Sequence, residues 1–439
     1  MTIRLNKANE TQGSVLMITI VITLLIGLGL ASYLSLMRCQ HIAGVRSQAW
    51  NAALAMAEAG VKETLAQLNP AALLFSTNID RGANGWSLEA DGMYHAPRRI
   101  ITSGSFTNGY YDVAITADLL PTIYATGYVT IPALSATIAR SVKVTTATTS
   151  VFRGSMAARV NIDLKGNGVS TDSFDSADPL HSTNGLYYAP WRKAAGDVAS
   201  TDGIINVQNA DVRGTLYTGP SGSYTMGAQG SVGDLAWVDG GTNGLQAGHY
   251  RNDFNLDFPP VLPPFETAIP PMGGMVSGTN YTWVLGNGNY KSLGDTKLKS
   301  GDTILVSGSA ILYVTGDFLM QGSSSIVIAP GANLQLYVGG ANSTIGTLNN
   351  AGNCATFTYF GLPSNTSVTL AGNDVFLGSI YAPSADLTMS GGGNNRLDYQ
   401  GACAVNTVGM NGHFNFHFDE NLKRQGPVRG YQISSWTEI

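Results

Sequence analysis

Two histidines near the end of the chain lie four residues apart, a spacing that on a helix can bind one metal ion. They are His413 and His417 in the segment GHFNFHFDEN. Phenylalanines alternate with polar residues in this segment: Phe414, Phe416 and Phe418. This period of two predicts a β-strand. On a strand the two histidines would lie about 13 Å apart, too far to share an ion. We expect a capping strand with its phenylalanines inward and a polar exit at residues 419–420.

Carboxylates could supply the general acid and base of a polysaccharide lyase or hydrolase. Such an enzyme would gather them on one face, whereas here they are scattered and mostly follow Gly or Asn: Asp295, Asp302, Asp317, Asp374, Asp386 and Asp398. We interpret them as turn formers. No nucleophile-elbow, zincin or P-loop spacing occurs either. The sequence predicts no catalytic residue, no cofactor and no enzymatic activity.

A denser acidic group lies at Asp172, Asp175 and Asp178. Three carboxylates at this spacing could bind calcium. They could equally accept hydrogen bonds from nearby backbone N–H groups in solvated Asx-turns. We expect the turns and no metal site.

An uncharged apolar run begins at Ser14 and ends at Met37. As a helix it would be about 36 Å long, enough to cross a bilayer core of about 30 Å. Apolar residues then recur every three or four positions from Trp50 to Leu68, and Asn69-Pro70 ends the pattern. The sequence therefore predicts one helix over residues 14–69, first transmembrane and then amphipathic.

Three fates of this N-terminus are open. A secretory signal could be cut before Ser32, since Gly29-Leu30-Ala31 precedes it. The run could be a plain anchor. Alternatively, residues 1–13 could be a leader cut after Gly13, which would leave the whole helix on the mature chain.

The segment from Gly13-Ser14 to ALAMAEAGVKETL (53–65) resembles the N-terminal region of PilX-like minor pilins and pseudopilins. The resemblance implies cleavage between Gly13 and Ser14 by a prepilin peptidase and storage in the inner membrane. It also implies packing with other pilins in a type IV pilus or pseudopilus. Most pilins carry a glutamate five residues into the mature chain, where this sequence has Ile18. Incorporation into a filament body is therefore left open.

Residues 70–153 alternate turn signals with β-branched runs and predict a small β unit. The resemblance implies that this unit packs on the amphipathic half of the helix.

Residues 154–430 contain internal repeats. FTYFGLPSNTSVTLAG (357–372) aligns with FLGSIYAPSADLTMSG (376–391) and LDYQGACAVNTVGMNG (397–412). One such unit cannot bury its own apolar face, so the copies must stack as a β-solenoid. The proline-rich stretch 258–271 cannot be a rung, and we expect a connector or strap that either separates two solenoid pieces or runs along one. Residues 431–439 are expected to be a tail.

This half also resembles an uncharacterised β-solenoid domain of bacterial envelope proteins. The resemblance rests on NIDLKGNGVSTDSFDS (161–176), IVIAPGANLQLYVGG (326–340), GSIYAPSADLTMSGGG (378–393) and VGMNGHFNFHFDENL (408–422). It implies a domain type and no activity.

The three cysteines, Cys39, Cys354 and Cys403, have no zinc-site spacing. In the repeat, Cys354 and Cys403 lie about two rungs, or roughly 10 Å, apart. A disulfide needs Cα atoms within about 7 Å. We expect a buried, free Cys403.

Together these features predict an α+β protein that is mostly β: a long N-terminal helix with a small β unit, then a parallel β-helix-like solenoid. Charged residues are 12% of the chain and the net charge is −5, with no basic block, so nucleic acid is not expected as a partner. We expect a single-pass inner-membrane protein with an extracytoplasmic domain, shown at the cell surface or in a pilus, which binds a surface glycan or protein. The alternatives are an adhesin with no pilus role and a β-helix carbohydrate-active enzyme.

Overall fold

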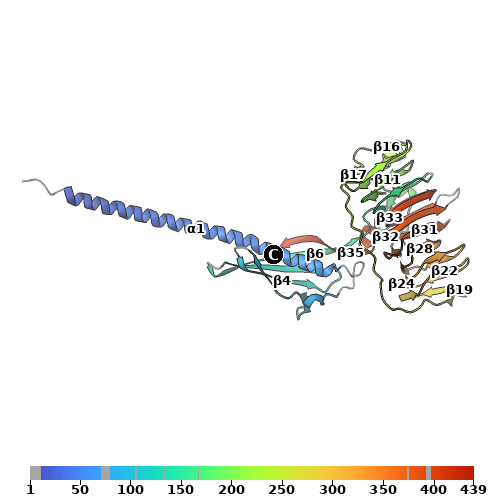
Figure 1. Cartoon of the computed structure of the whole chain (residues 1–439), viewed down its shortest axis with the longest axis horizontal. Coiled ribbons are helices and arrows are strands. Elements are labelled where there is room, and N and C mark those ends of the chain that lie inside the picture. Colours follow the sequence, from blue (N-terminus) through green and yellow to red (C-terminus); the bar gives the residue numbers. More distant parts are fainter. Residues whose placement is uncertain are drawn as a thin grey trace, which may run out of the picture. The chain divides into compact units, whose positions relative to one another are not determined.

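The computed structural model describes residues 11–70, 80–103, 106–131, 134–166, 168–372, 375–391 and 397–439 (Figure 1). The chain forms two compact units. The first contains the N-terminal helix up to Leu68, Asp80–Ala147 and Ile433–Ile439, and the second contains Thr148–Gln432. Residues 1–10 of the expected leader lie outside the described residues.

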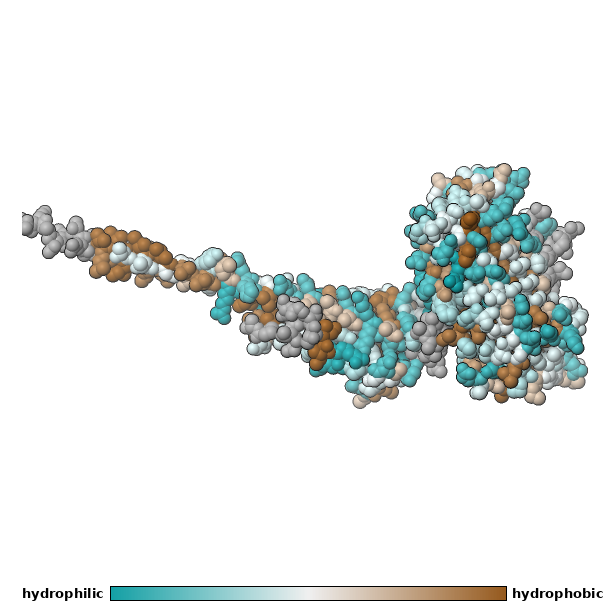
Figure 2. All heavy atoms as spheres, in the orientation of Figure 1, coloured by the Kyte–Doolittle hydropathy of each residue, from teal (hydrophilic) through white to brown (hydrophobic). Residues whose placement is uncertain are grey.

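Helix α1 (Thr11–Leu68) is continuous, so Ser14 and Met37 bound the apolar run and are not helix ends. The large apolar side chains between Val15 and Met37 are 47–72% exposed. Figure 2 shows this stretch of α1 as an apolar surface that no other element covers. Among the described residues, one helix is long and apolar enough to cross a membrane, and it is this one.

The second half of α1 packs through part of the apolar series that the sequence pattern predicted, since Ala57, Val61 and Leu68 are buried. Ala49, Ala53 and Ala57 are fully buried, whereas Trp50 is 49% exposed. Ala53 contacts Val129 and Ile131 of the small sheet. The buried face therefore agrees with the prediction from Ala57 onward, and before it Ala49 and Ala53 are buried in place of Trp50.

The small sheet has the order β1-β2-β4-β5-β6-β35, with β3 on β4. All pairings among β1 to β6 are antiparallel. Residues 431–439, predicted to be a tail, form most of β35, which lies beside β6. The strands are β1 (Ser87–Leu88), β2 (Met93–His95), β3 (Arg99–Ser103), β4 (Phe106–Thr116), β5 (Thr122–Ile131), β6 (Ala136–Ser150) and β35 (Val428–Glu438), with a short 3₁₀ helix, η2 (Ala83–Gly85), before them.

The second unit is a parallel β-solenoid of about nine turns in its described part, with three strands in a regular turn. Its first turn, β7-β8-β9, pairs in parallel with β10-β11-β12. The strands of the first part are β7 (Met156–Ala158), β8 (Ile162–Asp163), β9 (Ser170–Phe174), β10 (Val198–Ser200), β11 (Ile204–Asn206), β12 (Asp211–Arg213), β13 (Leu216–Thr218), β14 (Ser223–Thr225), β15 (Ser231–Gly233), β16 (Gly244–Leu245) and β17 (Tyr250–Arg251).

The part after the proline-rich stretch begins with the hairpin β18-β19 and ends with β34. Its strands are β18 (Gly274–Val276), β19 (Thr279–Tyr281), β20 (Trp283–Leu285), β21 (Gly288–Ser292), β22 (Thr296–Leu298), β23 (Thr303–Val306), β24 (Ser309–Val314), β25 (Phe318–Met320), β26 (Ser325–Ile328), β27 (Asn333–Val338), β28 (Asn342–Ile345), β29 (Thr347–Asn350), β30 (Phe357–Gly361), β31 (Ser367–Gly372), β32 (Phe376–Gly391), β33 (Leu397–Gly412) and β34 (Phe414–Asp419). Short helices are η4 (Ala189–Trp191), α2 (Leu235–Asp239) and α3 (Leu422–Gln425).

The chain does not wind this solenoid from one end to the other. β33 pairs with β7 and β8, and β34 pairs with β9. The last turn in sequence therefore stacks on the first turn, in the middle of the solenoid. One wall consequently runs β17-β13-β10-β7-β33-β32-β30-β27-β24-β21. The unit is one solenoid, and β34 is an internal strand and not the predicted cap.

The proline-rich stretch is a strap that leads from β17, at one end of the solenoid, to β20 and β21 at the other. It packs on the outer side of that wall, where Leu256, Val261 and Phe265 join the aromatic side chains of successive strands. These aromatic residues follow each other in register: Tyr313, Tyr337, Phe360 and Tyr381. The Tyr381 hydroxyl donates a 2.8 Å hydrogen bond to the Pro259 carbonyl.

The interior is filled by the alternate, inward side chains of all three walls. Cys403 lies in this core, as expected. Cys354 is buried outside it, in the cluster that Leu256 and Val261 form with the aromatic residues of the wall, which we call the strap cluster. Cys39 is exposed on α1, and all three cysteines are free.

Candidate functional site

A cluster of charged side chains lies where the last turn of the solenoid in sequence stacks on the first turn. His417 on β34 is 3% exposed, and its Nδ1 lies 2.5 Å from Asp172 Oδ1 on β9. Its Nε2 lies 3.4 Å from Asp398 Oδ1 on β33. Tyr187 stacks on the imidazole with a centroid distance of 3.6 Å and donates a 2.7 Å hydrogen bond to Asp172. We call these four residues the His417 cluster.

The electrostatics of this cluster favour a charged histidine. Burial alone would lower the pKa of His417, but the hydrogen bonds and charges of Asp172 and Asp398 outweigh it and raise the pKa above its ordinary value. Burial, and after it the charge of Asp172, raises the pKa of Tyr187. The two aspartates thus favour the charged form of the imidazole, and Tyr187 stays neutral as a hydrogen-bond donor.

His417 and Asp172 of the cluster are buried, whereas the side chain of Asp398 is 34% exposed. Of its members, Asp398 borders a cavity of about 20 Å³, which has room for one water. Two further ion pairs flank it: Lys193 with Glu420 at 2.6 Å and Arg424 with Asp175 at 2.6 Å. Each of these contacts joins residues 172–193 to residues 398–424. The arrangement holds the first and last turns together.

The predicted positions of the histidines and acidic residues need several corrections. His417 is buried and not on an outer face, because Asp172 compensates its charge. Phe414 and Phe416 point into the solenoid core, but Phe418 packs in the strap cluster instead. The expected polar exit also fails, since Asp419 is fully buried.

The three clustered aspartates have separate roles. Asp175 accepts a hydrogen bond from Ala177 N and Asp178 from Leu180 N, as expected for Asx-turns. Asp172 was expected to be solvated but is 3% exposed. Within the described residues, no group of three potential ligands is placed to hold a metal ion.

Most of the scattered aspartates act at turns and corners. Asp302 accepts from Lys299 N, and Asp295 accepts from Asp317 N on the next turn of the solenoid. Asp398 is the exception, since it faces His417. Asp374 lies outside the described residues.

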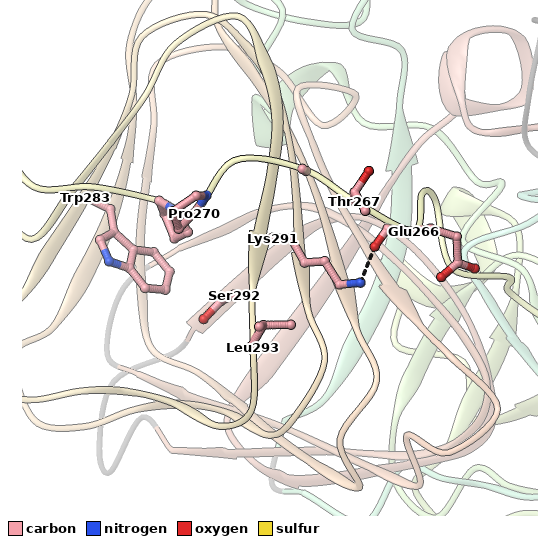
Figure 3. A pocket seen from close by; sticks show the side chains of 9 residues that line it. Glu266, Thr267, Pro270, Trp283, Lys291, Ser292 and Leu293 are labelled. Carbon is pink, nitrogen blue, oxygen red and sulfur yellow. Dashed lines mark hydrogen bonds between the residues drawn. The ribbon is translucent and has the colours of Figure 1, made fainter.

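A second candidate is an open pocket at the end of the solenoid where the strap arrives (Figure 3). It has a volume of about 490 Å³. Trp283 of β20 forms one side, and Lys291 and Ser292 of β21 with Leu293 form the other. Strap residues 266–271 complete the rim. We call this the strap pocket. It was not predicted from the sequence, because its lining residues belong to the strap and to two separate strands that only the fold brings together.

The predicted processing site lies at the start of α1. Gly13 and Ser14 belong to its first turns, directly before the exposed apolar run.

Comparisons with known proteins cover part of the chain. Residues 272–425 match the family described as Domain of unknown function (DUF7305). This range is the part of the solenoid after the strap. No curated protein matches. Among solved structures, the chain is similar to the competence-associated pilin ComZ from Thermus thermophilus, at 14% identity over 88% of this chain and 96% of that one. The TM-score of 0.27 is too low for this similarity to carry an argument.

Proposed function

We propose that this chain is a pilin-like envelope protein, anchored by α1 in the inner membrane, which displays the β-solenoid outside the cytoplasm as a non-catalytic binding or structural module. The PilX-like sequence segment supports the pilin pathway, with prepilin peptidase and other pilins as partners. The proposal does not include incorporation into the filament body, because Ile18 provides no carboxylate for a neighbour's N-terminal amine.

One observation carries the proposal: α1 is a single helix with two different environments. Its first half exposes apolar side chains that need a membrane or other apolar partners. Leaving apolar surface in water costs about 25 cal/mol of free energy per Å². Its second half is buried on an antiparallel sheet by Ala49, Ala53 and Ala57. This division supports an anchor that continues directly into a folded unit.

The non-catalytic role has its own support. The His417 cluster contains acid–base groups, but His417 and Asp172 are buried and pair with each other. The strap pocket is open, but among its lining residues only Glu266 and Lys291 have ionisable side chains. That composition favours binding.

Fractionation of the full chain in a Gram-negative host tests the proposal. The wild-type chain is expected in the carbonate-resistant membrane pellet, with the solenoid open to protease only after the outer membrane is permeabilised. The double change Ile22→Arg and Leu25→Arg places two charges in the apolar run and is expected to move the chain to the soluble fraction. Leu88→Arg, at an exposed position of β1, is the matched control. A wild-type chain that is soluble, or that stays protected from protease after the outer membrane is permeabilised, would contradict the proposal.

A further inference from the structure

The strap pocket is preformed. Lys291 N donates a 2.9 Å hydrogen bond to the Ile269 carbonyl, and Val284 N donates one of 2.9 Å to the Met272 carbonyl. The strap is thereby held on both strands that form the opposite walls. Trp283 is fixed by the pairing of β20 with β23, in register with Ile304. A ligand would meet walls that are already ordered, which lowers the entropic cost of binding.

The walls combine a flat apolar side with polar groups of both kinds. Trp283 offers an indole face, and Pro270 and Pro271 add rigid apolar surface. Lys291 Nζ donates to the Glu266 carbonyl, which leaves it two further N–H donors. Figure 3 shows Trp283 facing Lys291, Ser292 and Leu293 across the pocket.

This combination selects among ligands. A purely apolar group would cover Lys291 without giving it a partner, and that desolvation costs free energy. An anionic ligand would gain from Lys291 but meet the carboxylate of Glu266 on the same rim. A neutral sugar ring has an apolar C–H face for the indole and hydroxyls that both donate and accept.

We propose that the strap pocket binds a neutral hexopyranose unit of a glycan, with its C–H face on Trp283 and its hydroxyls on Lys291 and Ser292. The volume of about 490 Å³ lies within the ~300–1,000 Å³ of small-ligand pockets. Ile269 and Leu293, 60% and 80% exposed beside the pocket, provide apolar surface for neighbouring sugar units. The inference rests on the proposed function, because it names the class of ligand that the displayed solenoid would bind.

Saturation-transfer NMR on the full chain tests this, with maltotetraose, cellotetraose and chitotetraose as neutral probes and tetragalacturonate as the anionic one. A polyoxyethylene detergent keeps the chain soluble. Maltoside detergents are avoided, because their headgroups are themselves hexopyranosides and would compete for the pocket. At least one neutral probe is expected to bind, with the strongest transfer to ring C–H protons. Trp283→Ala is expected to weaken that binding about tenfold or more, and Trp283→Tyr much less. Trp436→Ala, at a tryptophan of β35 that is 41% exposed, is the matched control.

A second variant guards against misfolding of the first. Leu293→Trp adds bulk at an exposed rim position and is expected to block the pocket while far-UV circular dichroism stays unchanged. Failure of all three neutral probes, tighter binding of tetragalacturonate, or binding that neither variant reduces would overturn the glycan proposal. So would displacement of the sugar by an apolar proline-rich peptide that binds more tightly. Membrane pelleting of the same chain would be unaffected, so this failure is distinct from failure of the proposed function.

Discussion

His417 shows how a single residue can stabilise a joint between distant parts of a chain. The groups packed around it come from three places: Asp172 on β9, Asp398 on β33 and Tyr187 on the loop between β9 and β10. Because its pKa in the folded chain is raised, its stabilising effect is fully present below the unfolded value of about 6.5 and is lost as pH rises through the folded pKa.

His417→Gln should therefore destabilise the solenoid most at acidic pH. We expect a loss of about 3 kcal/mol near pH 6, the order seen when a buried ion pair loses one partner. The difference from wild type should shrink as pH rises past the folded pKa. Urea unfolding at a series of pH values measures it, with His413→Gln as the control four residues earlier. A constant difference across that range would show that His417 is neutral in the folded chain.

The sequence pattern correctly predicted that His417 lies on a strand but wrongly predicted that its side chain is exposed. The alternation of Phe414, Asn415, Phe416 and His417 predicts an exposed histidine, because alternation assumes that polar residues face water. Asp172 lies 245 residues away in sequence and compensates the buried charge. No local signal could have indicated that partner.

At the scale of elements, the contact between α1 and the small sheet depends on the absence of a side chain. A Cβ placed on Gly127 of β5 would overlap the carbonyl oxygen of Ala53. The alanine face of α1 and this glycine together bring helix backbone against strand backbone. The prediction was wrong at Trp50, because periodicity weights large apolar residues, whereas the close approach to the sheet at this point requires the small Ala49 and Ala53.

Gly127→Val tests this contact. Valine is the better strand former, but its Cβ cannot fit under α1, and we expect a loss of about 2 kcal/mol or more in the first unit. Faster hydrogen exchange of the β5 amides would report it. Gly109→Ala is the control, because there the added Cβ meets the flexible end of Met56 at 2.9 Å. Equal protection in wild type and Gly127→Val would refute the tight contact.

The strap is an element whose role follows from the order of the walls. Since β33 and β34 pair with β7, β8 and β9, the two parts of the solenoid are joined by sheet hydrogen bonds as well as by the strap. The prolines indicated that residues 258–271 are no rung. They could not indicate that the strap leads from one end of the solenoid to the other.

A specific protease site inserted between Leu262 and Pro263, both exposed, tests the joint. After cleavage, the two fragments should still elute together in gel filtration and separate only in denaturant. The uncut chain with the same insertion is the control and should elute at the same volume. Separation of the fragments under native conditions would contradict the stacking of β33 and β34 on the first turn.

At the scale of the whole molecule, the sequence predicted the classes of structure better than their order. The charge-free run, the amphipathic continuation and the aligned copies at 357–372, 376–391 and 397–412 were enough for a helix, a small β unit and a parallel solenoid. The sequence could not predict that the last turn stacks on the first in the middle of the solenoid. Repeats show which strands resemble each other, but they do not show which turns lie side by side. The last strand, β35, likewise joins a sheet begun more than 300 residues earlier.

The central claim is that α1 stays on the mature chain as a pilin-like anchor, and the mass of the N-terminal peptide tests it most directly. The chain should be extracted from membranes of cells with an active prepilin peptidase. The predicted first residue of the wild-type chain is Ser14. In the Gly13→Asp variant the leader should stay uncut. A first residue of Ser32 would mean a secreted protein without its helix, and an intact Met1 a plain anchor; either would contradict the account.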